Sequence, residues 1–573
     1  MKKQAIVLSL SLVMILAGQP ATASPSFLVE PYLQNPSTDG MTVMWETLDD
    51  GSALEYWKDG DTPVGVNAQK VPGRNICFAA LDGLESDTLY NYRVITDQGT
   101  DEIYRFKTWP ADGDDAGEFK MIIFSDSQGN HPERLLDICE NGIIDKECSG
   151  GEVQNCPEDI AAVLVAGDLV SSGDVVDQWR EEFFGPCKEL FHYVPLLPAI
   201  GNHDRPFVNY LDYFTLPDNG VIGRSEEWYT VDYKNLRIIA LNSCAYTIWQ
   251  WEWLDDVLAD ACSDPDIDYV LTQFHHACRS ETWPDGNDIQ ACAFVHSLEE
   301  FTRDCGKVSG HFHGHTHAYS RGQSRDVPHV WMNVGTSAGN IDYWGEYDPQ
   351  PDYDEFQVSL DEYGFTVWRI ATEGESSLTM VRRSGGDDDV YYGYTDDTIG
   401  DELTIDRSNS APYEPSPLHP VGVEVDHKNV SLQASLFSDP DLDFHLSSHW
   451  QVTEYAGIYG NPVVDAWGNV TRFENIYFDE NTQEGVDITF HAVDLQPDKT
   501  YYWRVRYRDE HLVWSDWSVE ASFTTAPLPA WGTASTMLVG ANSFSDVLNS
   551  LMLIAIPLGT VMLWRRASRR RTS

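Results

Sequence analysis

The stretch from Gly310 to Arg321 alternates histidine with small or apolar residues, reading Gly-His-Phe-His-Gly-His-Thr-His-Ala-Tyr-Ser-Arg. In an extended segment a period of two sends alternate side chains to one face, so all four histidines are predicted to face the same way. Neutral imidazole is the commonest metal ligand in proteins, and this spacing can supply nitrogens to one metal ion or to two adjacent ions. The alternative is a polar loop whose histidines only serve solubility. The four histidines are His311, His313, His315 and His317.

Two stretches far apart in the sequence share one pattern of alternating strand residues. Leu84–Val94 reads Leu-Glu-Ser-Asp-Thr-Leu-Tyr-Asn-Tyr-Arg-Val, and Leu495–Val505 reads Leu-Gln-Pro-Asp-Lys-Thr-Tyr-Tyr-Trp-Arg-Val. Short alternating runs separated by turn residues predict β-sandwiches around both stretches. Both resemble the late strand of a fibronectin type III domain. Such domains are expected over residues 27–108 and 411–526.

The character of the sequence changes between these two sandwiches, over about residues 118–384. Apolar runs typical of buried strands alternate there with helix-like segments. This order predicts an α/β domain whose site lies just past the strand ends. The expected strands include Phe119–Phe124, Ala161–Ala166 and Tyr269–Thr272, and the expected helices are Asp177–Leu190, Gln250–Ala261 and Ala293–Asp304.

Five short polar segments follow predicted strands of this middle domain. They combine carboxylates, a carboxamide and imidazoles, a set that can hold two adjacent divalent or trivalent cations. Glycines in these segments allow the backbone to turn sharply beside a packed metal centre. The segments are Ser125-Asp126-Ser127-Gln128, Gly167-Asp168-Leu169, Gly201-Asn202-His203-Asp204, Phe274-His275-His276 and Gly314-His315-Thr316-His317.

This set of segments resembles the calcineurin-like metallophosphoesterase superfamily. Upstream, Glu30–Pro36 followed by Thr42–Trp45 looks like the N-terminal sandwich of purple acid phosphatases, so the resemblance covers about residues 28–384. It implies a multidomain chain, in which a central α/β metallophosphoesterase domain, with a β-sandwich core flanked by helices, lies between two all-β fibronectin type III-like sandwiches.

The resemblance also implies a role for each residue of the motifs. Asp126 and His317 would hold the first metal ion, Asp168 would bridge both ions, and Asn202, His275 and His315 would complete the second site. His203 would face the phosphate and protonate the leaving group, with Asp204 as the carboxylate that orients it. The implied reaction is in-line attack on phosphorus by a metal-bound hydroxide, with iron, zinc or manganese as the metal pair.

Three departures from the family pattern concern the pocket. Purple acid phosphatases have a tyrosine three residues after the bridging aspartate, whereas this chain has Ser171, so no tyrosine-to-iron charge-transfer band is expected and the metal pair need not include iron. Gln128 stands where many superfamily members have a histidine. The stretch 278–288 lacks the further substrate-facing histidine of purple acid phosphatases. The chain is therefore expected to act on a small phosphorylated compound, as an acid phosphatase-like monoesterase or as a phosphodiesterase.

A second class of function is a surface-attached binding or adhesion protein whose phosphoesterase domain is inactive. The near-complete ligand set argues against it. Among the remaining polar residues, Arg321 can contact substrate or form a structural salt bridge, and His276 can support the ligands or face the substrate. His311 and His313 are expected to be structural, on the buried strand that leads to the ligand pair.

Charge and cysteine usage restrict the partners and the compartment. With 37 Lys and Arg against 91 Asp and Glu, the net charge is −54, which repels phosphate backbones and excludes a basic nucleic-acid-binding face. The 10 cysteines fit an oxidising compartment, and a local pairing such as Cys278 with Cys292 is expected. In the second sandwich, Asp439-Pro440-Asp441-Leu442-Asp443 suits a calcium loop, although the full twelve-residue pattern is missing and an ordinary acidic turn is the alternative.

Both ends of the chain carry apolar segments. Residues 1–23 have a positive start, an apolar run and an Ala-Thr-Ala site, which predicts a secretory signal peptide. Residues 547–573 combine an apolar stretch with an arginine cluster, which indicates a membrane anchor or a sorting tail recognised by sorting machinery. The protein is therefore expected to be secreted or held at the cell surface.

Overall fold

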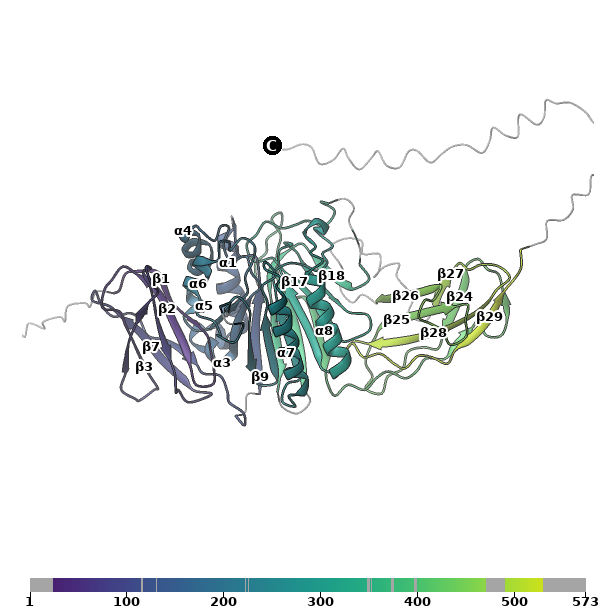
Figure 1. Ribbon diagram of the computed structural model, residues 1–573, viewed down its shortest axis with the longest axis horizontal. Helices are drawn as coiled ribbons and strands as arrows, with labels where there is room; N and C mark the ends of the chain where they lie inside the picture. The colour runs from purple at the N-terminus through teal and green to yellow at the C-terminus, as the bar shows by residue number, and fades with distance from the viewer. Residues whose placement is uncertain are drawn as a thin grey trace, which may run out of the picture.

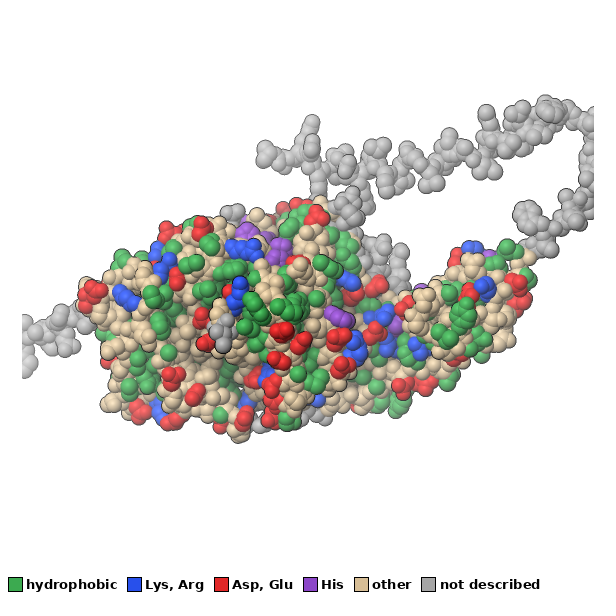
Figure 2. Space-filling view, viewed as in Figure 1, with side chains coloured by type: hydrophobic (Ala, Val, Ile, Leu, Met, Phe, Trp, Pro, Cys, Tyr) green, Lys and Arg blue, Asp and Glu red, His purple; other side chains and the backbone are tan. Residues whose placement is uncertain are grey.

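The computed structural model describes residues 24–528, except 115–116, 130, 222, 225, 348–350, 352, 373–375, 396–398 and 470–489 (Figure 1). The expected signal peptide and C-terminal tail lie outside these residues. Within them, no helix is long and apolar enough to cross a membrane. Figure 2 shows acidic side chains spread over the visible face of the molecule, in keeping with the strongly negative net charge.

Two sheets that share one hydrophobic core form the middle domain, as expected for a metallophosphoesterase β-sandwich. The first has ten strands, and its centre is parallel, since β9, β10 and β11 run in one direction. Its strands, in spatial order, are β21 (Ile399–Asp406), β20 (Ser377–Gly386), β19 (Tyr363–Ala371), β9 (Glu118–Phe124), β10 (Ile160–Val165), β11 (Leu196–Pro198), β1 (Phe27–Gln34), β2 (Met41–Thr47), β6 (Ile76–Leu81) and β5 (Gln69–Lys70).

The second sheet has seven strands, four of which are consecutive and parallel. The strands β13, β14, β15 and β17 are buried along their whole length, as is usual for parallel strands that are covered on both faces. In β15 this buries a serine and two histidines as well as apolar residues. The strands, in spatial order, are β12 (Tyr229–Tyr233), β13 (Leu236–Ala240), β14 (Tyr269–Gln273), β15 (Val308–His313), β17 (His329–Val334), β16 (Tyr319–Gln323) and β18 (Phe356–Leu360).

Helices cover the outer faces of both sheets (Figure 1). The helices α7 and α8 bury residues at helical spacing, such as Leu254 with Leu258 and Phe294 with Leu298, in a core shared with the second sheet. Thr247 caps the start of α7 by accepting from the Gln250 amide, and Gly306 (φ 69°) ends α8 in the left-handed conformation. The helices are α1 (Pro132–Asp137), η1 (Ile138–Ile144), α2 (Asp145–Glu147), η2 (Ser149–Gly151), η3 (Val153–Asn155), α3 (Cys156–Asp159), α4 (Val176–Gln178), η4 (Trp179–Phe184), α5 (Gly185–Phe191), α6 (Val208–Tyr213), α7 (Ile248–Ser263), η5 (Pro284–Gly286) and α8 (Ala291–Cys305).

The N-terminal sandwich is joined to the middle domain by a continuous sheet. Gln34 of β1 pairs with Leu196 of β11, so one half of this sandwich is the far end of the ten-stranded sheet. The sequence does not reveal this junction. The other half is a separate four-stranded sheet, made of β4 (Val64–Asn67), β3 (Ala53–Trp57), β7 (Leu89–Ile95) and β8 (Tyr104–Lys107).

The C-terminal sandwich has sheets of three and five strands around its own core, which contains Trp450 and Trp503. It meets the middle domain through a buried arginine, because Arg508 donates to the carbonyl oxygens of Ser324 (2.9 Å) and Val327 (3.0 Å). Its strands are β22 (Pro417–His419), β24 (Val430–Ala434) and β27 (Phe490–Val493) in one sheet, and β23 (Glu424–Val425), β29 (Ala521–Thr525), β28 (Thr500–Asp509), β25 (His445–Thr453) and β26 (Val464–Asn469) in the other.

Eight cysteines form four disulfides in the middle domain. The expected Cys278–Cys292 pair is confirmed. The others are Cys139–Cys187, Cys148–Cys156 and Cys262–Cys305, while Cys77 and Cys244 remain thiols.

Candidate metal centre

The five polar segments follow the carboxyl ends of five parallel strands, taken from both sheets of the middle domain. β9, β10 and β11 supply three segments from the first sheet, and β14 and β15 supply two from the second. Since both sheets end at the same edge, side chains that are far apart in the sequence come together there.

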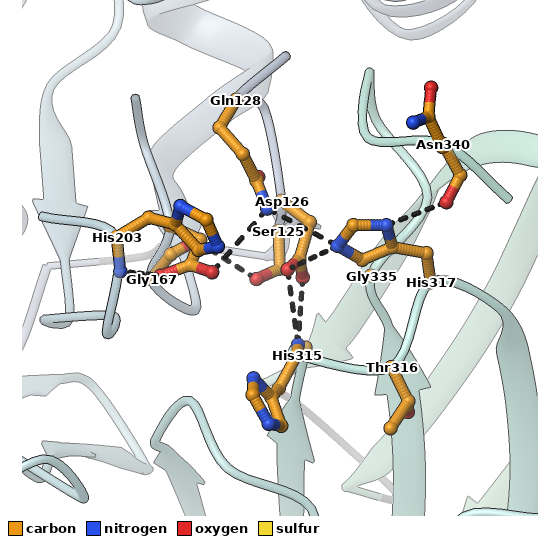
Figure 3. Close-up of polar contacts among 12 residues, drawn as sticks. Ser125, Asp126, Gln128, Gly167, His203, His315, Thr316, His317, Gly335 and Asn340 are labelled. Atoms are coloured by element: carbon orange, nitrogen blue, oxygen red, sulfur yellow. Dashed lines mark hydrogen bonds and ion pairs between the residues drawn. The ribbon is translucent and has the colours of Figure 1, made fainter. Parts of the chain in front are cut away.

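One half of the site is built around Asp126, which follows β9 and is fully buried. Its Oδ1 lies 3.2 Å from Nε2 of His317, and both of its oxygens accept from the His315 amide at 3.1 and 3.0 Å (Figure 3). Burial lowers the pKa of His317, but the Asp126 carboxylate more than offsets this and raises the pKa to about 9. An imidazole nitrogen and a carboxylate thus face each other at the distance of two ligands of one ion.

The other half is built around Asp168, which follows β10. Nε2 of His275 lies 3.0 Å from Oδ2 of Asp168 and 3.1 Å from Oδ1 of Asn202. One potential ligand atom each from Asp168, His275 and His315 lies within 4.8 Å of the other two. Burial, with the neighbouring His275 and His276 rings, lowers the pKa of His315 to about 2, which keeps its ring neutral.

The donor set fits two cations. The two halves together supply carboxylate oxygens, a carboxamide oxygen and imidazole nitrogens, and Asp126, Asp168 and His275 are fully buried. Gln128 connects the halves, since its Nε2 lies 3.2 Å from Nε2 of His317 and 3.4 Å from Oδ2 of Asp168. The structure therefore brings together all six residues that the sequence singled out as ligands, namely Asp126, Asp168, Asn202, His275, His315 and His317.

The backbone around the candidate ligands combines left-handed residues with glycines at points of close approach. Asp126 (φ 59°), Asp168 (φ 52°) and His315 (φ 69°) all adopt the left-handed conformation, which costs non-glycine residues energy and is concentrated at functional sites. A Cβ at Gly314 would come within 1.9 Å of Oδ2 of Asp126, and one at Gly201 would come within 2.1 Å of Oδ1 of Asp168. Glycine at these two positions lets the ligand loops approach each other.

The four alternating histidines do not share one face, so that prediction is wrong. β15 ends at His313, and the backbone of His315 is in the left-handed conformation. His315 and His317 therefore lie beyond the strand, in a loop that does not continue its alternation. His311 and His313 are buried within the strand, as expected for structural residues. His311 contacts His329 (2.9 Å between ring nitrogens) rather than the ligands.

His203 and Asp204 lie beside the ligands, but the contacts differ from those expected. Nδ1 of His203 lies 2.9 Å from the carbonyl oxygen of Ser171, whereas the Asp204 carboxylate was expected to orient this ring. The buried Asp204 carboxylate instead accepts from the amides of Asp168 (3.1 Å), Leu169 (2.9 Å) and Gly201 (2.8 Å). Asp204 thus fixes the two loops that carry Asp168 and Asn202, and a backbone carbonyl orients His203.

Sequence reasoning missed Glu182, which lies in η4 behind the site. Its Oε2 accepts from the amide (2.7 Å) and the hydroxyl (2.9 Å) of Ser171, the residue that contacts His203. Nothing in the local sequence marks this glutamate, because it belongs to a helix between two of the ligand segments and its neighbour Glu181 has the same chemistry.

Two residues left open by the sequence now have clear surroundings. Arg321 is buried and pairs with Asp401 of β21, with 3.0 Å between NH2 and Oδ1, so the salt-bridge alternative is confirmed. The His276 ring lies next to the His315 ring, with centroids 4.6 Å apart, and its Nδ1 contacts the Ser243 hydroxyl at 2.9 Å. His276 therefore supports the ligand residues from the side.

A pocket of about 240 Å³ opens over the ligands. Trp283 forms one wall, with its ring centroid 5.2 Å from that of His315, and Tyr347 stands beside it at 6.3 Å. The lining residues are Asp168, Asn202, His203, Trp283, His315, His317, Asp342 and Tyr347.

Three parts of the chain match models of known protein families. Residues 119–319 match the calcineurin-like phosphoesterase model, and residues 29–108 match the purple acid phosphatase N-terminal domain. Residues 474–529 match the N-terminal immunoglobulin domain of Rha78A-like proteins. The first two matches cover all of the ligand segments and the sandwich that precedes them.

Known proteins resemble the chain at low identity. Two uncharacterized proteins of Mycobacterium tuberculosis, from strains CDC 1551 and H37Rv, are 28% identical over 237 residues, which is 36% of this chain and 44% of each relative. The similarity thus spans less than half of the relatives' length.

Two solved structures share the fold. One is the purple acid phosphatase PPD1 from yellow lupin (TM-score 0.51, 17% identity, 67% of this chain and 74% of that chain). The other is PhoD (TM-score 0.51, 12% identity, 68% of this chain and 92% of that chain).

Proposed function

We propose that this chain, whose middle domain is a calcineurin-like phosphoesterase domain joined to a purple acid phosphatase N-terminal domain, is an exported metal-dependent hydrolase of phosphate esters. The observation that carries this proposal is the convergence of two ligand groups on one pocket. Asp126 with His317 forms one group, and Asp168 with Asn202, His275 and His315 forms the other.

The ligand residues would hold two cations of iron, zinc or manganese. When bound, such a pair activates water and neutralises charge that develops on phosphoryl oxygens. Ser171 offers no phenolate to the site, so a tyrosine-to-iron colour band is not expected even with iron bound. Asp168 would be the ligand shared by both ions, since its Oδ2 contacts His275 of the second group and Gln128, whose amide also contacts His317 of the first.

His203 would donate a proton to the leaving group. A carbonyl oxygen can only accept, so the contact with Ser171 requires a hydrogen on Nδ1 and leaves Nε2 as the nitrogen available to substrate. The His203 side chain is exposed in the pocket, and its amide donates to Oδ1 of Asp168 at 2.8 Å. A protonated His203 can therefore deliver the Nε2 hydrogen to the departing oxygen.

The substrate is a small phosphorylated compound. Cations held by the ligand residues would supply the positive charge for the phosphoryl group, while Trp283 and Tyr347 offer apolar surface to the organic part of the ester. A phosphomonoester is the first candidate, by analogy with the acid phosphatase-like fold.

A phosphodiester is the second candidate, and one observation favours it. Where purple acid phosphatases have a further substrate-facing histidine, this chain presents Trp283 to the pocket. A diester carries less negative charge than a monoester dianion and needs room for a second alcohol group, so the loss of a cationic side chain is less costly for a diester.

Export is supported by the four disulfides, because disulfides persist in oxidising compartments. We infer that residues 1–23 act as a signal peptide and that residues 547–573 attach the protein to a membrane or to sorting machinery. The rival function, a surface-binding protein with an inactive phosphoesterase domain, has less support, because all six ligand side chains are kept together.

The proposal is tested by hydrolysis of p-nitrophenyl phosphate and bis(p-nitrophenyl) phosphate by the full chain, supplied with zinc, manganese or iron in turn. Metal-dependent turnover is expected, and Asp168→Asn should reduce it by at least about 100-fold. The exposed Asp174→Asn serves as a matched control and should leave turnover unchanged. The preferred ester decides between monoesterase and diesterase. Absence of turnover with every metal, in a protein that binds metal, would refute the hydrolase and favour the surface-binding function.

A further inference from the structure

A second cluster of carboxylates lies far from the phosphoesterase pocket, in the C-terminal sandwich. Asp439 and Asp443 come from the loop before β25, and Asp509 ends β28. One carboxylate oxygen each from these three residues lies within 4.8 Å of the other two. Sequence spacing alone links Asp439 with Asp443, whereas Asp509 is brought in by the fold.

The decisive feature is an unsatisfied buried oxygen. Asp439 is only 8% exposed, and its Oδ2 has no hydrogen-bond partner, although its Oδ1 accepts from the Asp441 amide at 2.7 Å. Oδ2 of Asp443 is likewise buried without a partner. Buried acceptors are normally satisfied, and two such oxygens beside a third carboxylate carry a large cost unless a cation joins them.

Asp509 is already fixed in position by its neighbours. It is fully buried, its Oδ1 accepts from the amides of His511 (3.0 Å) and Val513 (2.9 Å), and its Oδ2 accepts from the Asn409 amide group at 2.8 Å. One wall of the cluster is therefore preorganised, while the 439–443 loop supplies the oxygens that lack partners.

Local positive charge does not neutralise the cluster. Among the ion pairs of the described residues, Asp439 and Asp509 have none with lysine or arginine, and Asp443 pairs only with His511, at 3.7 Å. The neighbouring Arg508 is buried, but its guanidinium donates to the carbonyl oxygens of Ser324, Val327 and Leu512. A cation bound between the three carboxylates would supply the missing compensation.

We propose that Asp439, Asp443 and Asp509 bind a calcium ion that fixes the 439–443 loop to the end of β28. Calcium suits the site because the ligands offered are all hard oxygens and because calcium tolerates the irregular geometry of a loop, whereas magnesium demands near-ideal octahedral geometry. Glu510 and His511, which group with Asp443, lie at the edge of the same cluster.

The site lies where the sandwich meets the middle domain. His511 contacts the carbonyl oxygen of Thr404 in β21 (2.9 Å from Nδ1), and Arg508 precedes Asp509 in the interface. Basic side chains are visible at this junction in Figure 2. Calcium binding would thus stiffen the contact between the two domains, independently of catalysis.

Binding is tested by equilibrium dialysis of the full chain against radioactive calcium, with zinc present at saturation to fill the phosphoesterase centre. A single calcium ion per chain is expected, with a dissociation constant below about 1 mM, as in extracellular calcium modules. Asp439→Asn and Asp443→Asn should each abolish this binding. Asp441→Asn is the matched control, because the Asp441 carboxylate lies in the same loop but accepts from the Ser410 amide, outside the cluster.

Thermal unfolding gives a second readout that a purely structural carboxylate would not produce. In a chelator, Asp443→Asn should melt at a higher temperature than the unmodified chain, because it relieves repulsion between carboxylates. With calcium, the unmodified chain should gain several degrees and Asp443→Asn should not respond. Failure of the unmodified chain to bind calcium, or equal binding by Asp439→Asn and Asp443→Asn, would overturn the proposal.

Discussion

At the scale of single residues, Gln128 is the side chain that most clearly distinguishes this pocket from the superfamily pattern, in which many members have a histidine at this position. Its amide lies between His317 and Asp168, and its Oε1 is buried without a hydrogen-bond partner. Rotation of the amide by half a turn would exchange the oxygen and nitrogen and offer the oxygen to the first metal ion. We expect Gln128→Leu to weaken retention of that ion by about 10-fold or more, measured as metal content after dialysis against graded chelator.

Gln128→Glu provides the comparison for this prediction, since it keeps the shape and an oxygen ligand and should retain the ion at least as well as glutamine. If Gln128→Leu keeps both ions as tightly as the unmodified chain, Gln128 has no role in metal binding.

We expect Glu182 to act as a positioning residue for His203, the proposed proton donor. Its carboxylate holds Ser171, whose carbonyl contacts His203, so Glu182→Gln should disturb the His203 ring without touching the metal ligands. Proton donation matters most for poor leaving groups, so hydrolysis of an alkyl phosphate should fall by about 10-fold or more, and that of p-nitrophenyl phosphate by less. The ratio of the two rates is the measurement.

The exposed Glu181→Gln is the matched control for Glu182, because it removes the same charge from the adjacent position. An equal loss of rate on both esters in Glu182→Gln would indicate a general structural effect and contradict the positioning role.

The residues of the candidate metal centre could be singled out from the sequence, while the side chains that hold them in position could not. Asp126, Asp168 and His315 stand in short motifs directly after strands, where chemistry and position coincide. Asp204 belongs to such a motif too, but its contacts with backbone amides depend on how two loops approach each other. Glu182 and Asp509 have no motif at all, because their partners are remote in sequence and only the fold brings them together.

At the scale of elements, the second sheet depends on two long helices joined by a disulfide. Cys262 lies in the last turn of α7 and Cys305 ends α8, at a sequence separation of 43 residues, whereas Cys148 and Cys156 are 8 residues apart. Loop-closure entropy predicts the cost of losing each disulfide. Replacing Cys262 and Cys305 by serine should lower the free energy of unfolding by about 4 kcal/mol, whereas replacing Cys148 and Cys156 should lower it by about 2.5 kcal/mol. Urea unfolding followed by tryptophan fluorescence measures both losses.

The order of the two losses is the test, since both variants remove a disulfide from the same domain. A larger loss from the Cys148 and Cys156 pair would contradict the entropic account.

Helices with a strong period in their apolar residues could be predicted from the sequence, whereas the points at which strands end could not. The helices expected at Gln250–Ala261 and Ala293–Asp304 correspond to α7 and α8, because each buries apolar residues every three to four positions. The histidine stretch shows the limit of the period-two argument. Two of its histidines lie in β15, which ends just before Gly314. Gly314 packs closely against the Asp126 carboxylate, which is remote in sequence, so the local sequence does not predict that the strand ends there.

At the scale of the whole molecule, the N-terminal sandwich and the middle domain are expected to unfold as one unit. They share the ten-stranded sheet, and Glu46 of β2 accepts from Arg180 of η4 at 2.9 and 2.7 Å and from the Tyr213 hydroxyl at 2.9 Å. Glu46→Ala leaves Arg180 with only the exposed Asp177 as its ion-pair partner and removes the acceptor of the buried Tyr213 hydroxyl, which should cost about 2 kcal/mol. Thermal unfolding should show one transition for both domains, shifted to lower temperature.

Glu55→Ala is the matched control for Glu46, since it removes a glutamate from the Glu55–Arg93 ion pair, which is partly exposed and lies within the N-terminal sandwich. That loss should stay below about 1 kcal/mol. Separate transitions for the two domains in the unmodified chain would contradict the shared unit.

The domain order was predictable because each domain has its own sequence pattern, but the joints between domains were not. The pairing of β1 with β11 and the insertion of Arg508 between the carbonyls of the middle domain involve residues that look ordinary in sequence. Their roles depend on which surfaces meet, and that is a property of the folded chain.

We infer that two metal ions held by Asp126, Asp168 and their partners would make this chain a phosphoesterase. Titration of the metal-stripped full chain with zinc, at saturating calcium, would follow bound zinc together with p-nitrophenol release from the preferred p-nitrophenyl ester. Two zinc ions per chain are expected, with p-nitrophenol release rising as the second ion binds, and neither full occupancy nor release in Asp168→Asn. Release at full rate with a single ion bound, or zinc occupancy unaffected by Asp168→Asn, would rule out the two-metal hydrolase.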